Sequence, residues 1–571
     1  MTAQLSSMEA ARSAVAVLVR GGVRDVVVAP GSRSAPLAYA LAEAEARGEV
    51  RLHVRIDERV AGFTALGLSL GSLRPVPVVT TSGTAVGELL PAVMEANHAA
   101  VQLVVISADR PGELRGTGAN QTTEQPGLFG SHVRYAADIP AGEDPAGTLA
   151  GGLLAARGLA APDHQGAAGP VHINLAFRDP LFPAADDDGG TAAVPAVTAA
   201  AGSREMAVPA PVPGPGPEPS AAAGGSGRTV VVAGHGAGAY AEAFARSQAL
   251  PLLAEPSSNA RFGPNAVGPY RLLLDPLGAG IERVVVFGRP TLSRPVAALL
   301  ARPDVQTALY LPGPVAWFRR GKRRERIITG PAELALFAGQ GPAGWLQGWQ
   351  RADRAADAAL QAVLAGTPEL TGFEAAAAVW AHTRGRLVLG SSNTIRDVDL
   401  AGRPQPDPQC TVYANRGLAG IDGTTATATG IALGTGGRTR ALVGDLTFLH
   451  DAGGLLLGAG EAEPALQLVV LNDAGGGIFS LLEHGEVGTR PRYAAAVERL
   501  FGTPHQAGIA QLAAAYGLGY RLVEDRAQLE PVLKEEFTGR GIVEIRTDRS
   551  GLRRLHARVR EAIWSAAGGQ P

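Results

Sequence analysis

The chain has 571 residues, of which 46% are hydrophobic, and its 51 Lys and Arg against 53 Asp and Glu give a formal net charge of −2. This near-neutral balance lacks the basic excess that neutralises nucleic-acid phosphates, so it argues against a nucleic-acid partner. The length is sufficient for three or four domains that each bury a core.

The single cysteine, Cys410, forms no internal disulfide and supplies no thiolate cluster for a metal, which is typical of a reducing cytoplasm. The first 20 residues lack the basic and apolar regions of a secretory signal, and no stretch approaches 18 uninterrupted apolar residues. We therefore expect a cytoplasmic protein without a membrane span.

Short apolar runs alternate with helix-sized amphipathic segments along the chain. A helix is predicted over 7–20 and another over 59–69, and the apolar runs predict buried strands at 26–28, 76–80, 103–106, 171–175, 229–233, 283–287, 387–389, 441–443 and 468–471. Strands that are buried on both faces and alternate with helices indicate an α/β protein with mainly parallel sheets.

Breaks in composition divide this pattern into three parts. Residues 186–228 are rich in Ala, Pro, Gly and Ser and are predicted to be a linker, and a weaker break at 339–344 leads into a helical segment. We therefore predict an N-terminal domain over 1–185, a middle domain over 229–365 and a C-terminal domain over 366–571.

Two acidic turns follow predicted strands in the C-terminal part. Gly444-Asp445-Leu446 comes after one strand and the segment NDAGGG at 472–477 after the next, so that Asp445 and Asp473 are 28 positions apart. Parallel sheets place ligands at the carboxyl ends of their strands, and carboxylates there can hold Mg²⁺ whose other ligands are phosphate oxygens and water. Either turn alone is also explained by a carboxylate that caps the next helix, but the pair at this spacing favours a metal site.

These two turns resemble the diphosphate-binding motif of thiamine-diphosphate enzymes, which begins with Gly-Asp and ends with an Asn-rich turn. Leu446 stands where the motif usually has a small residue, and Asp473 stands where it usually has Asn. The class also needs a glutamate against the aminopyrimidine ring of the cofactor, and Glu58, at a predicted strand-to-helix junction, is the candidate. Taken alone, Glu58 is better explained as an acid in the first turn of a helix, but the pair of Asp445 and Asp473 favours the cofactor role.

Longer blocks resemble the 2-succinyl-5-enolpyruvyl-6-hydroxy-3-cyclohexene-1-carboxylate synthase family, which are thiamine-diphosphate enzymes of menaquinone biosynthesis. The blocks are APGSRSAPL at 29–37, TSGTA at 81–85, ADRP at 108–111, GANQ at 118–121, GPVHIN at 169–174, SSN at 391–393, NRG at 415–417, GIDG at 420–423 and GIFS at 477–480. The resemblance covers both outer domains densely and the middle domain thinly. It implies three α/β domains in the order pyrimidine-binding, middle and diphosphate-binding.

The resemblance also implies roles for particular positions. The implied cofactor positions are Glu58, Ile421, Gly444, Asp445, Leu446, Asp473, Gly475 and Gly476, with Asp445, Asp473 and the Gly475 carbonyl as metal ligands. The implied substrate positions are Ser32, Arg33, Arg110, Asn120, Gln121, Arg294, Ser392, Arg396, Arg416, Ile478, Phe479 and Leu482. Glu58 is implied to activate the cofactor, and Asn120 and Gln121 to orient the developing oxyanion or a proton-carrying water.

The implied enzyme is a transferase that uses thiamine diphosphate with Mg²⁺ or Mn²⁺. It decarboxylates 2-oxoglutarate and adds the resulting succinyl carbanion equivalent to isochorismate. Both substrates carry two carboxylates, which the forks of Arg33, Arg110, Arg396 and Arg416 would suit, although any one arginine alone is also explained by an ion pair. In this class the cofactor lies between domains of different subunits, so a homodimer or homotetramer is implied.

Some alternatives remain open. Another thiamine-diphosphate carboligase or 2-oxo acid decarboxylase would share Glu58 and the metal motif. A nucleotide-binding regulatory protein would use the turn GHGAG at 234–238, although this turn lacks the G-x-G-x-x-G spacing and is better explained as a tight turn. The histidines, including His505, show no ligand-like spacing and are expected to be mostly structural. In the middle domain, Arg289 and Arg294 are either anion ligands or members of surface ion pairs.

Overall fold

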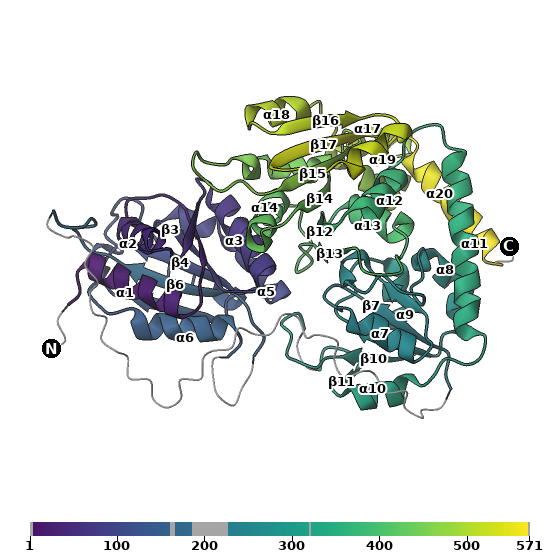
Figure 1. Cartoon of the computed structure of the whole chain (residues 1–571), viewed down its shortest axis with the longest axis horizontal. Coiled ribbons are helices and arrows are strands. Elements are labelled where there is room, and N and C mark those ends of the chain that lie inside the picture. Colours follow the sequence, from purple (N-terminus) through teal and green to yellow (C-terminus); the bar gives the residue numbers. More distant parts are fainter. Residues whose placement is uncertain (1–3, 160–165, 186–225, 319–320, 569–571) are drawn as a thin grey trace.

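The computed structural model describes residues 4–159, 166–185, 226–318 and 321–568. Its named strands form three sheets that follow one another along the chain, and all of their pairings are parallel (Figure 1). The prediction of an α/β protein with mainly parallel sheets is confirmed. Residues 186–225, which make up most of the predicted linker, lie outside the described residues.

The first sheet has six strands in the order β2(Arg51–Val54), β1(Asp25–Val28), β3(Val76–Thr80), β4(Leu103–Asp109), β6(Val171–Ala176) and β5(Tyr135–Ile139). One face is covered by α1(Ser7–Arg20), α2(Ala35–Ala46) and α6(Ala146–Ala156). The other face is covered by α3(Glu58–Ser72) and α5(Leu90–Ala99). Both faces are therefore buried, which explains why the central strands are continuous apolar runs.

The second sheet has five strands in the order β11(Arg326–Ile328), β10(Gln306–Tyr310), β9(Arg283–Phe287), β7(Thr229–Ala233) and β8(Leu252–Ala254). One face packs against α7(Tyr240–Ser247) and α10(Pro331–Ala338). The opposite face packs against α8(Tyr270–Leu277) and α9(Arg294–Ala301), together with α11(Trp345–Ala365) and the C-terminal helix α20(Leu552–Ala566). The end of the chain thus returns to the middle sheet.

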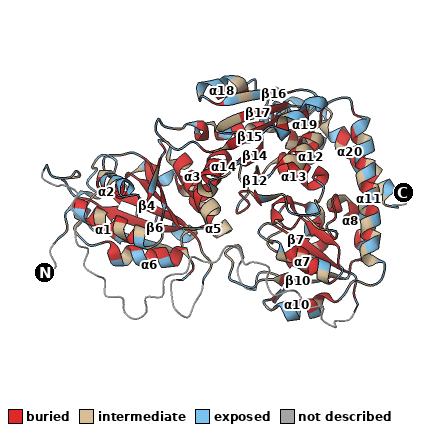
Figure 2. Cartoon of the chain, viewed as in Figure 1, coloured by how far each residue is buried: buried red, intermediate tan, exposed pale blue. Residues whose placement is uncertain are grey.

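The third sheet has six strands in the order β13(Cys410–Tyr413), β12(Gly385–Leu389), β14(Thr439–Gly444), β15(Leu466–Asn472), β17(Arg540–Arg546) and β16(Gly519–Val523). One face carries α12(Gly372–His382), α13(Asn393–Ala401) and α19(Arg526–Lys534), and the other carries α14(Thr424–Thr435), α15(Asp445–His450) and α18(Ile509–Ala515). Figure 2 shows that the central strands and the helix faces turned toward them are buried. No helix of the described chain is long and apolar enough to cross a membrane.

Helices α3 and α14 join the first and third sheets through a stripe of glycines. A Cβ atom on Gly67 would lie 2.1 Å from the carbonyl oxygen of Thr427, and one on Gly430 would lie 2.2 Å from that of Thr64. Backbones this close leave room only for glycine. Each helix connects the carboxyl end of one parallel strand to the start of the next, so both run from the carboxyl edge of their sheet to its amino edge.

Candidate active site

The two predicted acidic turns meet at the carboxyl edge of the third sheet. Asp445 begins α15 directly after β14, with Gly444 at the N-cap position, and its carboxylate is buried. Asp445 Oδ1 accepts a hydrogen bond from the amide of Leu446 at 2.6 Å, and Oδ2 accepts one from the amide of Gly475 at 2.8 Å. The first turn is therefore tied to the glycine segment of the second.

Asp473 follows β15 and lies close to Asp445. Burial, together with the negative charge of Asp445, raises the pKa of Asp473 to about 7, although Arg549 opposes this shift. No group of three or more His, Cys, Asp or Glu side chains in the described ranges is arranged to hold a metal. A cation at this acidic pair would therefore complete its coordination with the Gly475 carbonyl, phosphate oxygens or water, which are the ligands that Mg²⁺ prefers. The donor set fits a divalent cation.

His505 also belongs to this edge of the site, although sequence reasoning treated it as structural. Its Nε2 lies 3.0 Å from Asp445 Oδ2. The segment just before it covers the glycine turn, because the Gly476 amide donates to the Gly502 carbonyl at 2.7 Å. No spacing in the sequence links His505 to Asp445, since 60 positions separate them.

Two predicted substrate arginines lie near the same edge. Arg396, on α13, donates to the carbonyl oxygen of Ser392 at 2.6 Å, and burial followed by the charge of Arg416 lowers its pKa. Arg416 is buried and its Nη2 donates to Thr291, at 2.7 Å to Oγ1 and 3.1 Å to the carbonyl oxygen. Its Nε and Nη1 are buried and have no partner among the described residues. Two neighbouring guanidinium groups with unused donors suit an anion.

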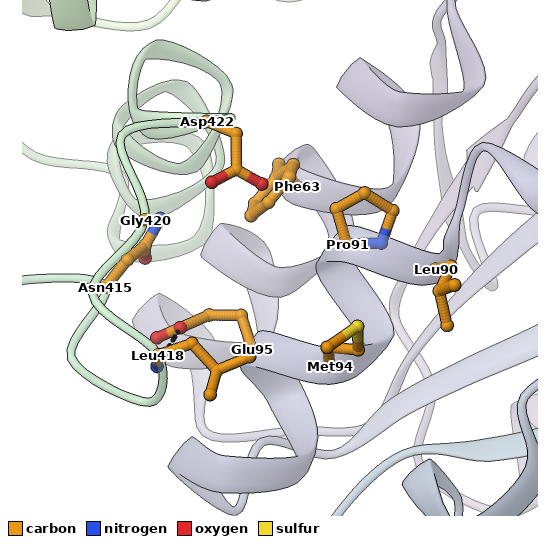
Figure 3. Close-up of a pocket in the computed structure, with 9 residues that line it drawn as sticks. All are labelled: Phe63, Leu90, Pro91, Met94, Glu95, Asn415, Leu418, Gly420 and Asp422. Atoms are coloured by element: carbon orange, nitrogen blue, oxygen red, sulfur yellow. Dashed lines mark hydrogen bonds between the residues drawn. The ribbon is translucent and has the colours of Figure 1, made fainter.

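Two buried carboxylates from the other two domains hold the backbone around Arg416. Glu95, on α5, accepts hydrogen bonds from the amides of Gly417 and Leu418, both at 2.7 Å. Figure 3 shows Glu95 beside Leu418. Glu255, after β8, accepts hydrogen bonds through Oε1 from the amides of Thr291 and Leu292, both at 2.8 Å. Since Thr291 in turn accepts from Arg416, all three domains set the position of this guanidinium. Sequence reasoning singled out neither carboxylate.

A small, mostly apolar pocket of about 220 Å³ lies beside Glu95, between the first and third domains (Figure 3). Its lining residues are Phe63, Leu90, Pro91, Met94, Glu95, Asn415, Leu418, Gly420 and Asp422. Ile421, the predicted support of the cofactor, is half-buried in this same segment just before α14.

A second group of predicted residues gathers at the carboxyl edge of the first sheet. Arg110 follows β4, and its Nη1 donates to Ser82 Oγ at 2.8 Å and to the Gln121 carbonyl oxygen at 2.6 Å. Arg33 donates through Nη1 to the Phe177 carbonyl oxygen at 2.9 Å, and its buried Nε has no partner within the described ranges. Burial lowers the pKa of Arg33, and the nearby charge of Arg110 lowers it further. Two further predicted positions, Ser32 and Asn120, are exposed.

Glu58 is the first residue of α3 and is half-buried. Asp57 caps the helix by accepting a hydrogen bond from the amide of Val60 at 3.1 Å. Glu58 itself has no hydrogen bond or ion pair among the residues that the structure describes, so its carboxyl is available. The adjacent Arg59 donates to the carbonyl oxygen of His450 at 3.3 Å, which places the start of α3 beside the end of α15.

The remaining predicted residues lie around a 3₁₀ turn, η6(Gly477–Leu481), which holds Ile478 and Phe479. Leu482 follows it and lines a pocket of about 330 Å³ together with Arg294. The Arg294 Nη1 lies 2.6 Å from Glu483 Oε1, and both side chains are more than two-thirds exposed. Arg294 therefore makes the surface ion pair that the sequence left as an alternative to an anion ligand. Arg289 instead donates to the Gly417 carbonyl oxygen at 2.8 Å.

The glycine-rich turn at 234–238 is closed by its own domain. The amide of Gly234 donates to the Phe287 carbonyl at 2.9 Å, that of His235 to Arg289 at 3.0 Å, and that of Gly238 to Ser258 at 2.8 Å. A nucleotide-binding turn presents such amides to phosphate. Their use within the fold supports the interpretation as a tight turn.

Comparison with known families assigns the N-terminal and C-terminal parts of the chain to one class of enzyme. The family described as "Thiamine pyrophosphate enzyme, N-terminal TPP binding domain" matches residues 8–128, and "Thiamine pyrophosphate enzyme, C-terminal TPP binding domain" matches residues 401–546. A solved structure, benzoylformate decarboxylase from Polynucleobacter necessarius, has the same fold, with a TM-score of 0.65 and 15% identity over 95% of this chain and 99% of that one. The chain is a thiamine-diphosphate enzyme.

Curated relatives define the family more narrowly. Proteins named 2-succinyl-5-enolpyruvyl-6-hydroxy-3-cyclohexene-1-carboxylate synthase match the whole chain. The one from Paenarthrobacter aurescens is 62% identical over 100% of this chain and 99% of its own. Those from Arthrobacter sp. (strain FB24) and Renibacterium salmoninarum are each 59% identical, over 99% and 98% of this chain and 93% and 98% of their own. The chain belongs to the 2-succinyl-5-enolpyruvyl-6-hydroxy-3-cyclohexene-1-carboxylate synthase family.

Proposed function

We propose that the enzyme decarboxylates 2-oxoglutarate and joins the remaining succinyl unit to isochorismate, giving 2-succinyl-5-enolpyruvyl-6-hydroxy-3-cyclohexene-1-carboxylate and CO₂ for menaquinone biosynthesis. The observation that carries this proposal is the full-length identity of 62% with a relative of that name. The buried arginines with unused donors support it, because both substrates are dicarboxylates.

Thiamine diphosphate would lie with its diphosphate at the acidic pair. When bound, it supplies a carbon nucleophile and accepts the electron pair that decarboxylation leaves behind. Asp445, Asp473 and the Gly475 carbonyl would hold Mg²⁺ or Mn²⁺, and Gly444, Leu446 and Gly476 would border the diphosphate. The fit rests on one buried and one half-buried carboxylate, Asp445 and Asp473, which lie close enough for the charge of Asp445 to raise the pKa of Asp473.

Glu58 would exchange a proton with the aminopyrimidine ring, since its carboxyl is half-buried and has no partner among the described residues. Asn120 and Gln121 would orient the developing oxyanion or a water. Arg33 and Arg110 would bind carboxylates from the side of the first domain, and Arg396 and Arg416 from the side of the third. The remaining substrate contacts would come from Ser32, Ser392, Ile478, Phe479 and Leu482.

The complete site would form between two copies of the chain. Within the described residues, no hydrogen bond or ion pair joins Arg33, Arg110 or Glu58 to the predicted residues of the third sheet. A homodimer or homotetramer would bring the two edges together across a subunit interface. The cytoplasmic location expected from the single cysteine also stays a prediction.

The test combines purified protein, thiamine diphosphate, Mg²⁺, 2-oxoglutarate and isochorismate, and follows isochorismate absorbance together with CO₂ release. Coupled loss of isochorismate and release of CO₂, dependent on every component, is the expected result. Release of CO₂ without loss of isochorismate would reject the acceptor but keep the thiamine chemistry. Activity with pyruvate in place of 2-oxoglutarate would instead indicate a different carboligase or decarboxylase.

A further inference from the structure

A polar cavity of about 480 Å³ lies between the first and third sheets, at the edge opposite the candidate active site. Its walls come from the starts of strands and the ends of helices: Asp25 begins β1, Arg51 begins β2, and Arg386 is the second residue of β12. The lining residues are Arg24, Asp25, Arg51, Gly71, Ser72, Arg74, Arg386, Thr411, Tyr413, Gly434 and Thr435. The only aromatic ring of the lining is that of Tyr413.

The charges of this cavity are unbalanced, because four arginines face a single carboxylate. Arg51 lies 2.8 Å from Asp25 Oδ1, which also lies 2.9 Å from the His53 ring, so Asp25 is already shared. In the described part of the chain, the Arg24 guanidinium donates to backbone carbonyl oxygens alone, such as that of Val23 at 2.9 Å. Among the described residues, three guanidinium groups are therefore left without a carboxylate.

Two of these arginines also have unused hydrogen-bond donors. Within the part of the chain that the structure describes, the side chains of Arg74 and Arg386 have no hydrogen-bond or ion-pair partner, although both residues are half-buried. The carboxyl ends of α3 and α14 border the cavity, and their partial negative charge explains how the arginines gather there. This electrostatic attraction does not occupy the N–H donors of the guanidinium groups, so these donors remain available to a ligand.

We propose that this cavity, which we call the amino-edge pocket, binds a small anion with several negative charges. Guanidinium groups bind phosphate and carboxylate oxygens through paired, charge-assisted hydrogen bonds, and the hydroxyl groups of Thr411 and Tyr413 add further donors. The volume is that of a small-molecule site. The polar lining favours an oligophosphate or a tricarboxylate over a ligand with a large apolar group.

The amino-edge pocket is separate from the active site but is connected to it by two helices. Helix α3 starts at Glu58 and ends at the pocket, and α14 starts just after Ile421 and also ends there. Their backbones touch along the glycine stripe, so a ligand that moves the end of either helix acts on α3, which carries Glu58, or on α14, which directly follows the Ile421 segment. The pocket thus has a physical route to the cofactor site.

The test uses isothermal titration calorimetry of the protein saturated with thiamine diphosphate, with free Mg²⁺ matched in cell and syringe. Inorganic triphosphate and citrate are the two probes, and they distinguish phosphate from carboxylate as the source of the charge. We expect saturable binding of at least one probe. Arg74→Gln and Arg386→Gln should each weaken it at least about tenfold, the effect of losing a charge-assisted hydrogen bond.

Arg326→Gln is the matched control, because it removes the same charge from an exposed ion pair with Glu333 on the middle domain. It should bind the probes like the unchanged protein. Hydrogen exchange should also slow at 71–76 and 434–439 when the probe is added. Absence of binding, equal weakening in all three variants, or protection at Arg33 and Arg110 instead would overturn the proposal.

Discussion

Glu58 has the position of a proton-transfer group, half-buried at the first residue of a helix and without a described partner. Glu58→Gln keeps the size of the side chain but removes the acidic proton. We expect the turnover rate to fall at least about a hundredfold, the lower range for an acid–base group. Steady-state kinetics at saturating cofactor measures this, and a calorimetric titration with thiamine diphosphate controls for lost binding. Near-normal turnover would remove Glu58 from the mechanism.

Glu255 is a buried carboxyl whose charge costs stability. Burial raises the pKa of Glu255 to about 7, from an ordinary value of 4.5. The folded state therefore holds this proton more tightly than the unfolded state, so the stability that Glu255 contributes is present at low pH and is lost as the pH rises from about 4.5 to 7.

Glu255→Gln should abolish this dependence. Glu255 accepts both of its backbone hydrogen bonds through Oε1, so a glutamine can keep them. Relative to the unchanged protein, we expect the variant to gain about 2 kcal/mol in the free energy of unfolding between pH 5 and pH 8. Urea unfolding of both proteins at the two pH values measures this. A constant difference would mean that Glu255 does not change its protonation on folding.

At the scale of elements, Glu95 holds the segment after β13 with both of its carboxylate oxygens, whereas Glu255 uses only one. Glu95 accepts one amide on each carboxylate oxygen, from Gly417 and from Leu418. A glutamine can accept only one of them and turns an N–H group toward the other, so Glu95→Gln should displace Arg416. We expect KM for one of the two substrates to rise about tenfold, the cost of one unsatisfied buried group, with a smaller change in kcat.

The pair of variants separates geometry from charge. Both glutamines remove a buried negative charge near Arg416, but only the one at position 95 breaks a backbone hydrogen bond. Kinetics with each substrate varied in turn should therefore show a change in KM for Glu95→Gln and little change for Glu255→Gln. Equal effects would indicate that the charges, and not the hydrogen bonds, control Arg416.

A second prediction at this scale concerns the stability that the contact between α3 and α14 provides. Gly430→Ala places a methyl group against backbone atoms of α3, which cannot move away as a side chain can. We expect a loss of about 1–3 kcal/mol in the free energy of unfolding, typical of overpacking. Gly87→Ala is the control, because a Cβ there has no neighbour within 4 Å. Urea unfolding that shows equal stability for the two variants would contradict this account.

Sequence patterns predicted the elements whose own residues are apolar wherever they are buried. The runs at 229–233 and 283–287 match β7 and β9 because both strands are covered on two faces and are almost wholly apolar. Strand β16 was missed because it lies at the outer position of its sheet, is partly exposed and contains arginine. Periodicity has little contrast in such strands.

Contacts within the site also divide into those that local sequence patterns predict and those that they do not. Asp445 and Asp473 could be paired from the sequence because parallel strands bring their carboxyl ends to one edge. Glu95 could not be assigned to the Arg416 segment, since 322 positions separate it from Gly417 and no local pattern encodes that contact. The same reason hid His505 beside Asp445.

At the scale of the whole molecule, the question is which copies of the domains form one site. Glu58 and Asp445 come from different sheets, and no hydrogen bond or ion pair of the described residues joins the predicted groups around them. If the site lies between subunits, a dimer has two sites, each with Glu58 from one chain and Asp445 from the other. A dimer of Glu58→Ala with Asp445→Ala then contains one intact site and one site with both changes.

Mixing the two inactive variants under subunit exchange should therefore restore activity. Random exchange at equal amounts makes half of the dimers hybrid, and each has one intact site of two, so recovery should reach roughly a quarter of the unchanged activity. Native mass spectrometry of chains with different tags verifies the exchange, and each variant mixed with itself is the control. Exchange without recovery would place Glu58 and Asp445 of a working site on the same chain, because both hybrid chains would then still lack one of them.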